Sequence, residues 1–313
     1  MQHHTTPIRD CRALFVGCAK DCAKTLPGVL LNIDRMSKLF GETAFVFVEN
    51  DSRDSTKQQL QLWCRSKPSP SHLLSLDGLA AACSIRTVRL ETARNCYLSM
   101  IRSRFCHYDF VFVLDCDDVN TAEIDLDAVR YAIDFLRQGT NYAGVFANSG
   151  KFYYDLWALR HAERCPADVW EEACDYVFRH RVSDDEAFDQ TFSKRIFSLQ
   201  ADAPPLEVDS AFGGFAIYKV TSVLRNKRRF LGHKRKVIPA PHGSIEVGWQ
   251  CCEHVPFNAG FRELGERLFI LPYLINHKEP SRNFHPSAWR TLAFPLAWIP
   301  TQIVEAQKIG RRT

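Results

Sequence analysis

The sequence lacks the features that mark several classes of protein. No window reaches the roughly 18 uncharged apolar residues that a membrane-spanning helix needs, and no charged-then-apolar export signal opens the chain. There is no internal repeat, low-complexity tract or linker-like stretch, and the 12 cysteines form no pair of C-x-x-C motifs with zinc spacing. These absences predict a reduced protein of the cytoplasm.

A strong charge of either sign is lacking too. Forty Lys and Arg residues are set against 36 Asp and Glu, and the net charge of +4 predicts no nucleic-acid partner. The basic excess is local, in residues 227–236 and at the end of the chain. Such a stretch is either a solvated face or a contact for an anionic substrate or a membrane surface. Peripheral contact at the inner face of the membrane, through 227–236 and the C-terminal tail, is therefore an alternative.

What the sequence does contain is an alternation of apolar strands and amphipathic helices in its first half. Strands are expected at 13–17, 44–48, 85–90, 110–114 and 143–147, helices at 25–40, 57–64, 91–105 and 126–138, and a loop at 68–71. This order predicts a parallel, doubly wound sheet for the first half. The second half is less regular, with an apolar run at 215–218 and a helix expected over 252–265. In such sheets ligands bind beyond the carboxyl ends of the strands.

Polar clusters follow three of the expected strands, after Gly17, after Val48 and after Leu114. The third cluster is the richest in chemistry, because Asp115, Asp117 and Asp118 leave an apolar strand within four residues. Carboxylates this close repel one another unless a cation is present or their pKa values rise. Mg²⁺ or Mn²⁺, completed by the oxygens of a nucleotide diphosphate, suits such a group. The alternative is an acidic cap for the following helix, from Asp118 or Asn120.

The second cluster, residues 49–56, consists of short acceptor and hydroxyl side chains. Such side chains bind a ribose hydroxyl or the edge of a base, although the same residues also suit a turn that leads into a capped helix. Arg94 is either a solvated helix residue or a fork-shaped donor to phosphate or to the metal-binding carboxylates.

Taken in order, residues 49–56, then 93–95, then 115–118 resemble the donor half of GT-A-fold nucleotide-sugar glycosyltransferases. Residues 49–56 are similar to the aspartate-rich nucleotide loop of the inverting family that includes cellulose and hyaluronan synthases, and residues 153–160 to a segment of the fungal capsule α-mannosyltransferase group. The resemblance covers about residues 12–160 and is weaker onward to His277. One departure is Glu49-Asn50 in place of the usual Asp-Asp. Another is Glu253-His254 in place of the acceptor-side glutamate-aspartate pair.

The resemblance implies a single large α/β domain with a GT-A (Rossmann-like), mostly parallel central sheet flanked by helices. The domain would span 1–285, with a nucleotide-sugar-binding half at about 12–150 and an acceptor half at 151–285, and 286–313 would form a C-terminal helical tail. The expected substrates are a UDP- or GDP-hexose and a saccharide or lipid-linked acceptor, and the expected cofactor is Mn²⁺ or Mg²⁺.

The resemblance also implies roles for single residues. The metal would be held by Asp115 and Asp117 with His277 as a third ligand, and Asp117 and Glu253 would act in catalysis, Glu253 as the base if the reaction inverts configuration. The donor would contact Gly17, Glu49, Asn50, Asp51, Arg94 and Asp115. Two other functions stay open at this point, a phosphatase of the haloacid-dehalogenase type with Asp115 as nucleophile, and a non-catalytic sugar-binding protein. The late position of the acidic motif, after about three strands, counts against the phosphatase.

Overall fold

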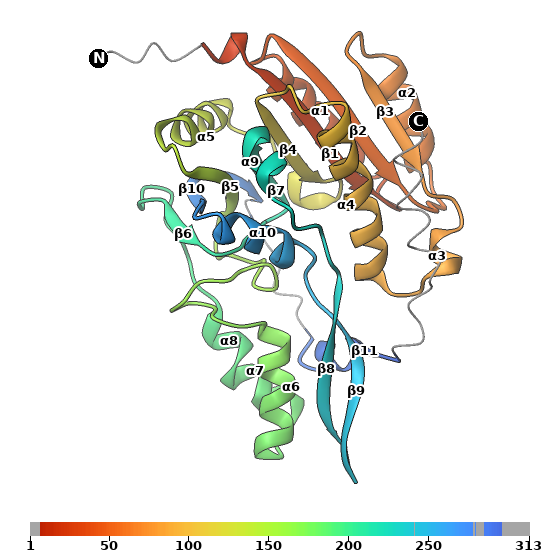
Figure 1. The fold of residues 1–313 in the computed structure, drawn as a ribbon, viewed down its shortest axis with the longest axis vertical. Helices are drawn as coiled ribbons and strands as arrows, with labels where there is room; N and C mark the ends of the chain where they lie inside the picture. Colours follow the sequence, from red (N-terminus) through yellow and green to blue (C-terminus); the bar gives the residue numbers. More distant parts are fainter. Residues whose placement is uncertain (1–6, 241, 278, 280–284, 296–313) are drawn as a thin grey trace.

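An eight-stranded mixed sheet runs through the molecule, in the order β3-β2-β1-β4-β7-β5-β10-β6 (Figure 1). The computed structural model describes residues 7–240, 242–277, 279 and 285–295. The strands of this sheet are β1 (Arg12–Ala19), β2 (Glu42–Glu49), β3 (Ser71–Ser75), β4 (Phe110–Asp115), β5 (Tyr142–Ser149), β6 (Leu206–Val208), β7 (Phe215–Lys219) and β10 (Arg267–His277).

The four strands β3, β2, β1 and β4 are parallel to one another, as the alternation of strands and helices predicts. Cys18 of β1 lies opposite Val48 of β2 on one side and Asp115 of β4 on the other. The carboxyl ends of these three strands are therefore level, and the residues that follow them gather at one edge of the sheet.

The second half of the chain completes the same sheet. β7 lies between β4 and β5 and is antiparallel to both, while β10 pairs with β5 in parallel and β6 pairs with β10 in antiparallel. The predicted strand at 143–147 is confirmed as β5, but it is not the neighbour of β4. The two expected halves thus interleave in one sheet, which is mostly parallel.

Helices cover both faces of this sheet, and the core has two layers. In β1, Leu14 and Val16 pack into one layer and Ala13 and Phe15 into the other, because successive side chains point to opposite faces. The longer helices are α1 (Leu26–Ser37), α2 (Thr56–Arg65), α4 (Arg86–Ser103), α5 (Leu126–Gln138), α6 (Val169–His180) and α10 (His254–Glu263). The short ones are η1 (Ile8–Asp10), α3 (Leu79–Ala82), η2 (Asp118–Asn120), α7 (Asp184–Gln190), α8 (Phe192–Arg195), α9 (Val220–Arg225) and η3 (Ala288–Thr291). Among the described residues, none of these helices combines the length and the apolarity that crossing a membrane requires.

The predicted strand at 85–90 is wrong, because these residues form the start of α4. Thr87 and Val88 are buried there while Arg86 is exposed, which is the one-sided burial of a helix that lies on a sheet. The strand beside β2 is instead β3, which begins at Ser71, in the stretch expected to be a loop. Its short, partly exposed and polar sequence is typical of an edge strand.

A second sheet of three strands, in the order β11-β9-β8, lies below the large sheet in the view of Figure 1. β8 (His233–Ala240) and β9 (Gly243–Gln250) form a hairpin, so the basic stretch 227–236 runs into a strand rather than along a helix face. β11 (Ala293–Phe294) pairs with β9. Over its described part the predicted helical tail contains the short helix η3 and the strand β11, which pack onto the domain. The tail itself stays a prediction, because 296–313 lie outside the described residues.

Candidate functional site

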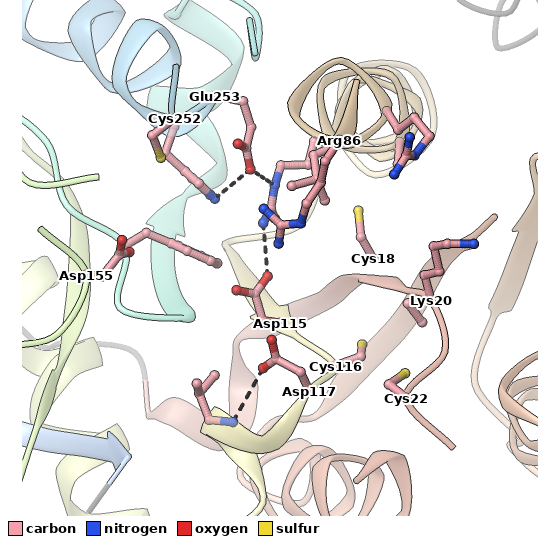
Figure 2. A pocket seen from close by; sticks show the side chains of 18 of the residues that line it. Cys18, Lys20, Cys22, Arg86, Asp115, Cys116, Asp117, Asp155, Cys252 and Glu253 are labelled. Atoms are coloured by element: carbon pink, nitrogen blue, oxygen red, sulfur yellow. Dashed lines mark hydrogen bonds and ion pairs between the residues drawn. The ribbon is translucent and has the colours of Figure 1, made fainter. Parts of the chain in front are cut away.

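A cleft of about 500 Å³ lies at the carboxyl ends of β1, β2 and β4. Its wall comes from both halves of the chain: the ends of these strands, the first turns of α4, the segment 154–157 and the start of α10. Figure 2 shows Asp115 and Asp117 near its centre, between Asp155 and Cys252 on one side and Lys20 and Cys22 on the other. Of the residues predicted to form the site, five line this cleft: Asn50, Arg94, Asp115, Asp117 and Glu253.

The acidic motif places two carboxylates next to each other. Asp115 is the last residue of β4, and Asp117 caps η2 by accepting a hydrogen bond from the backbone N–H of Val119 at 3.4 Å. The surrounding protein atoms and the neighbouring Asp115 carboxylate raise the pKa of Asp117 to about 7. The pair therefore shows the mutual repulsion expected of carboxylates that converge without enough positive charge between them.

Arg94 compensates part of this negative charge. Its Nη2 donates to Asp115 Oδ1 at 2.9 Å and its Nε donates to Glu253 Oε1 at 2.7 Å, while Nη1 donates to Tyr97 at 3.2 Å. The Arg94 side chain is only 2% exposed. Of its alternative roles, the structure shows the one in which the guanidinium holds a carboxylate of the motif, that of Asp115.

Buried amides hold the loop after β4 in place. Asn120 donates through Nδ2 to the carbonyls of Asp115 and Gly214, both at 2.8 Å, and accepts through Oδ1 from Asn276 at 2.9 Å. Asn276 lies at the end of β10 and also donates to the Gly213 carbonyl. Asp118 and Asn120 were the expected helix caps, but Asp117 occupies the capping position of η2. Asn120 is buried and instead joins the loop to Gly214 and Asn276 by hydrogen bonds.

Three other residues predicted to contact the donor are not part of the cleft wall. Gly17 lies within β1, where an added Cβ would come within 2.8 Å of Cys116 Sγ. Glu49 is fully buried and accepts hydrogen bonds from the Ser52 N–H and the Ser75 hydroxyl. Burial tends to raise the pKa of Asp51, but hydrogen bonds from the backbone N–H groups of Ala80 and Gly78 outweigh it and lower that pKa. Glu49 and Asp51 shape the loop that carries Asn50, and the contact of all three residues with a donor stays a prediction.

His277 ends β10, and its ring packs edge to face against Tyr154 at a centroid distance of 5.5 Å. It is not part of the cleft wall. Within the described residues no group of three His, Cys, Asp or Glu side chains has the spacing to hold a metal ion. The structure therefore brings Asp115 and Asp117 together but does not add His277 to them, and its role as a third ligand stays a prediction.

The structure adds cleft residues that the sequence did not single out for a role. Lys20 donates to the carbonyls of Asn50 and Asp51, at 3.2 and 2.8 Å, and so joins the ends of β1 and β2. Arg86 is exposed at the start of α4 and borders the same cleft. Asp155 lies within the 153–160 segment that resembles the capsule mannosyltransferases. The only sequence pattern that could have indicated a role for Asp155 is its acidic side chain among neighbouring aromatic residues.

His254, next to Glu253, is buried, and neither ring nitrogen has a hydrogen-bond partner, although Nε2 lies 3.8 Å from Glu253 Oε1. It stacks on Phe212 at a centroid distance of 3.7 Å. Burial and the nearby Arg94 lower the pKa of His254 well below its ordinary value. The ring is therefore neutral and serves the packing beneath the Arg94–Glu253 pair.

Comparison with known proteins finds no family model that matches the chain and no curated protein with a similar sequence. A comparison with solved structures does find similar chains. One is the mannosyltransferase PcManGT from Pyrobaculum calidifontis in complex with GDP-Man and Mn²⁺, with a TM-score of 0.48 and 16% identity over 91% of this chain and 61% of that one. Another is S. aureus TarS 1–349, with a TM-score of 0.44 and 13% identity over 84% of this chain and 58% of that one.

A third is glucosyl-3-phosphoglycerate synthase from Mycobacterium tuberculosis, in complex with Mn²⁺, UDP and glucosyl-3-phosphoglycerate. It has a TM-score of 0.32 and 12% identity, over 70% of this chain and 60% of that one. The chain spans about three fifths of the length of the solved structures that it matches. Identities this low and TM-scores below 0.5 say nothing of what this chain binds.

Proposed function

We propose that this chain is a glycosyltransferase that moves a hexose from a nucleoside diphosphate sugar to a saccharide or lipid-linked acceptor, with a divalent metal ion as cofactor. The observation that carries the proposal is the pair Asp115 and Asp117, which converge in a cleft at the carboxyl ends of parallel strands. This is the edge at which open α/β sheets bind nucleotides.

The donor set fits Mn²⁺ or Mg²⁺, which prefer carboxylate oxygens completed by phosphate and water. Arg94 occupies Asp115 Oδ1, and the hydrogen bond to Asp117 from Val119 is long, so oxygens of both carboxylates remain available. The raised pKa of Asp117 indicates that a cation would be stabilised at this point. Asp115 and Asp117 are therefore the residues that would hold the ion, and a bound ion would supply positive charge to the departing diphosphate.

The two sides of the cleft suit the two parts of a nucleotide sugar. Lys20 and Asn50, on the side of β1 and β2, offer a cation and an amide to the nucleoside. Tyr154 and Trp157, on the other side, offer aromatic rings of the kind that pack on sugars. The diphosphate would then lie between them, beside Asp115 and Asp117.

Arg94 and Glu253 form the rigid support of this site. Because the guanidinium is buried and held at 2.7 Å by Glu253, it fixes the position of the Asp115 carboxylate before any ligand binds. A preorganised charged group costs no reorganisation when negative charge develops on the leaving group. The buried contact with Arg94 supports a positioning role for Glu253, and its role as a base stays a prediction.

Turnover of candidate substrates tests the proposal. The chain is incubated with UDP- and GDP-hexoses and Mn²⁺, and the release of nucleoside diphosphate is measured for the wild type and for Asp117→Ala. We expect release by the wild type and its loss in the variant. Release of phosphate from simple phosphomonoesters instead would favour the haloacid-dehalogenase-type phosphatase. Binding of a nucleotide sugar without any turnover would favour a non-catalytic sugar-binding protein.

Contact with the membrane surface stays a prediction, as does the cytoplasmic location. Much of the basic stretch is engaged within the protein, because Arg228 pairs with Glu263, Lys234 with Glu171 and Lys236 with Asp175. Neutralised cations attract an anionic lipid surface less strongly than free ones.

A further inference from the structure

Asp155 is a cleft carboxylate that has no role in the function proposed above. It precedes α6 in the chain and lines the cleft together with Tyr154 and Trp157. Figure 2 shows it across Asp115 and Asp117 from Lys20. If the nucleoside lies on the Lys20 side, Asp155 faces the end of the cleft at which an acceptor must enter.

Backbone amides fix the Asp155 carboxylate relative to the acidic motif. Its Oδ2 accepts from the Gly213 N–H at 2.9 Å and its Oδ1 accepts from the Ala158 N–H at 3.3 Å. The next residue, Gly214, accepts the N–H of Asp115 on its carbonyl at 2.9 Å. The Gly213–Gly214 turn and these two hydrogen bonds thus connect the two aspartates, so that Asp155 is held on the same frame as the acidic motif.

Asp155 and Glu253 differ in their fitness to accept a proton. Glu253 is 5% exposed and its Oε1 is held by Arg94, so that protonation would break a buried ion pair. Within the described part of the chain, Asp155 has no ion pair, and each of its oxygens accepts one N–H and keeps a lone pair. Asp155 is half-buried at the cleft wall, where a hydroxyl can reach it.

We propose that Asp155 is the catalytic base that takes the proton from the acceptor hydroxyl, an inference that rests on the function proposed above. In the transfer, the acceptor oxygen forms a bond to the anomeric carbon while the bond from that carbon to the diphosphate oxygen breaks. The electron pair of the broken bond leaves with the nucleoside diphosphate, and the hydroxyl proton passes to the Asp155 carboxylate. Attack from the face opposite the leaving group inverts the configuration of the anomeric carbon.

The surroundings of Asp155 suit this task. Burial raises the pKa of Asp155 to about 6, and the charges of Asp115 and Glu253 add to the effect. The other titratable groups nearby, Tyr153, Tyr154 and Cys252, all have pKa values raised by burial and are neutral at pH 7. A base is most effective when its pKa lies near the working pH. The rate should therefore fall as the pH decreases through about 6.

The test compares the wild type with Asp155→Asn, Asp155→Glu and Glu253→Gln, using whichever UDP- or GDP-hexose the wild type turns over and methyl hexosides as acceptors. For Asp155→Asn we expect the rate of transfer to fall by about 10²–10⁴-fold. The decrease of the rate below about pH 6, which is the acid limb of the pH–rate profile, should be lost in this variant. Its affinity for the nucleoside diphosphate with Mn²⁺ should change by less than about threefold. Asp155→Glu should recover part of the rate together with the pH limb. The product, followed by NMR, should have the inverted anomeric configuration.

Four results would overturn the inference. Transfer by Asp155→Asn within tenfold of the wild type, or with the limb near pH 6 intact, would remove Asp155 as the base. Equal losses of rate, nucleoside diphosphate affinity and thermal stability would make its role structural. Retention of configuration would exclude a base of this kind, and loss of the pH limb in Glu253→Gln alone would assign the base to Glu253. If the wild type turns over no nucleotide sugar, the proposed function itself fails, which is a separate result.

Discussion

Arg94 is the residue on which the geometry of the site depends most. It joins three elements, α4, the end of β4 and the start of α10, through its bonds to Asp115 and Glu253. Removing one partner from a buried ion pair costs far more than the pair contributes, because the remaining charges stay buried without compensation.

Replacing Arg94 with Met should therefore destabilise the fold by about 3–5 kcal/mol, as measured by urea unfolding. The matched control is the double variant Arg94→Met with Glu253→Gln, which removes the Glu253 charge that the first change leaves behind. We expect the double variant to recover part of the lost stability. A double variant that is less stable than Arg94→Met alone would show that the buried charge is not the cause.

The raised pKa of Asp155 has a consequence for stability. In the unfolded chain the carboxyl has its ordinary pKa of 3.8, and in the fold its pKa is about 6. Between these two pKa values the native state binds more protons at this carboxyl than the unfolded chain does. The contribution of Asp155 to the free energy of unfolding therefore decreases as the pH rises from about 4 to 6, and it does not change further above about pH 6. The difference in unfolding free energy between the wild type and Asp155→Asn should shrink by up to about 3 kcal/mol from pH 4 to pH 7. A difference that is constant over this range would contradict the shift.

At this scale the sequence indicated where the acidic motif lies in the fold, but not which residues support it. Asp115 and Asp117 could be found because a short acidic motif directly after an apolar strand is a local pattern. Asp155 could not, because its place depends on Gly213, 58 residues away in the chain. Glu49 and Asp51 share the composition of a ligand-binding loop, and only the structure shows that their oxygens are taken by backbone N–H groups and a Ser75 hydroxyl.

Among the elements, the turn of Gly213 and Gly214 before β7 connects the acidic motif to the second half. Both glycines have positive φ angles, of 65° and 75°. A Cβ on Gly214 would come within 2.5 Å of Val119 and 3.0 Å of the Tyr154 hydroxyl, so this position needs glycine for its conformation and for its space.

Gly214→Ala should thus combine backbone strain with a steric clash beside the cleft. We expect a loss of unfolding free energy of about 2–4 kcal/mol and weaker nucleoside diphosphate binding. The control is Gly265→Ala, which has a φ of 71° but no atom within 4 Å of the added Cβ, and so carries the strain alone. Equal losses of stability in both variants, with unchanged binding, would show that the clash at Gly214 is unimportant.

The elements that were predicted correctly are those with a complete local signal. β1, β2 and β4 are continuous apolar runs, and α1 and α5 carry apolar residues at helical spacing. The apolar run at 215–218 forms β7, but its insertion between β4 and β5 depends on long-range pairing, which no local pattern of the sequence indicates. The start of α4 was mistaken for a strand because Ile85, Val88 and Leu90 are β-branched or bulky, and burial against the sheet decided the outcome.

On the scale of the whole molecule, the C-terminal segment belongs to the domain as far as the structure describes it. Trp289 is 5% exposed and packs edge to face on Phe178 of α6, and Arg290 forms an ion pair with Asp184 of α7. Phe294 covers Gly248 of β9. The segment 285–295 thus connects the helices α6 and α7 with the second sheet.

Trp289→Ala should cost about 3–5 kcal/mol of unfolding free energy, which is the range for removing a buried aromatic side chain. Leu62→Ala is the control, because Leu62 is 67% exposed and should change the stability by no more than about 0.5 kcal/mol. Similar values for the two variants, measured by chemical denaturation, would mean that the segment is not part of the cooperative fold.

The central claim is that Asp115 and Asp117 bind a divalent ion and a nucleoside diphosphate together. Calorimetric titration of UDP and GDP into the protein, with Mn²⁺ and with a chelator, tests it most directly, using the wild type and Asp117→Asn. The account predicts that Mn²⁺ strengthens the binding of one diphosphate at least about tenfold in the wild type and not in the variant. Equal affinity with and without Mn²⁺ in the wild type, or an undiminished metal effect in Asp117→Asn, would contradict it.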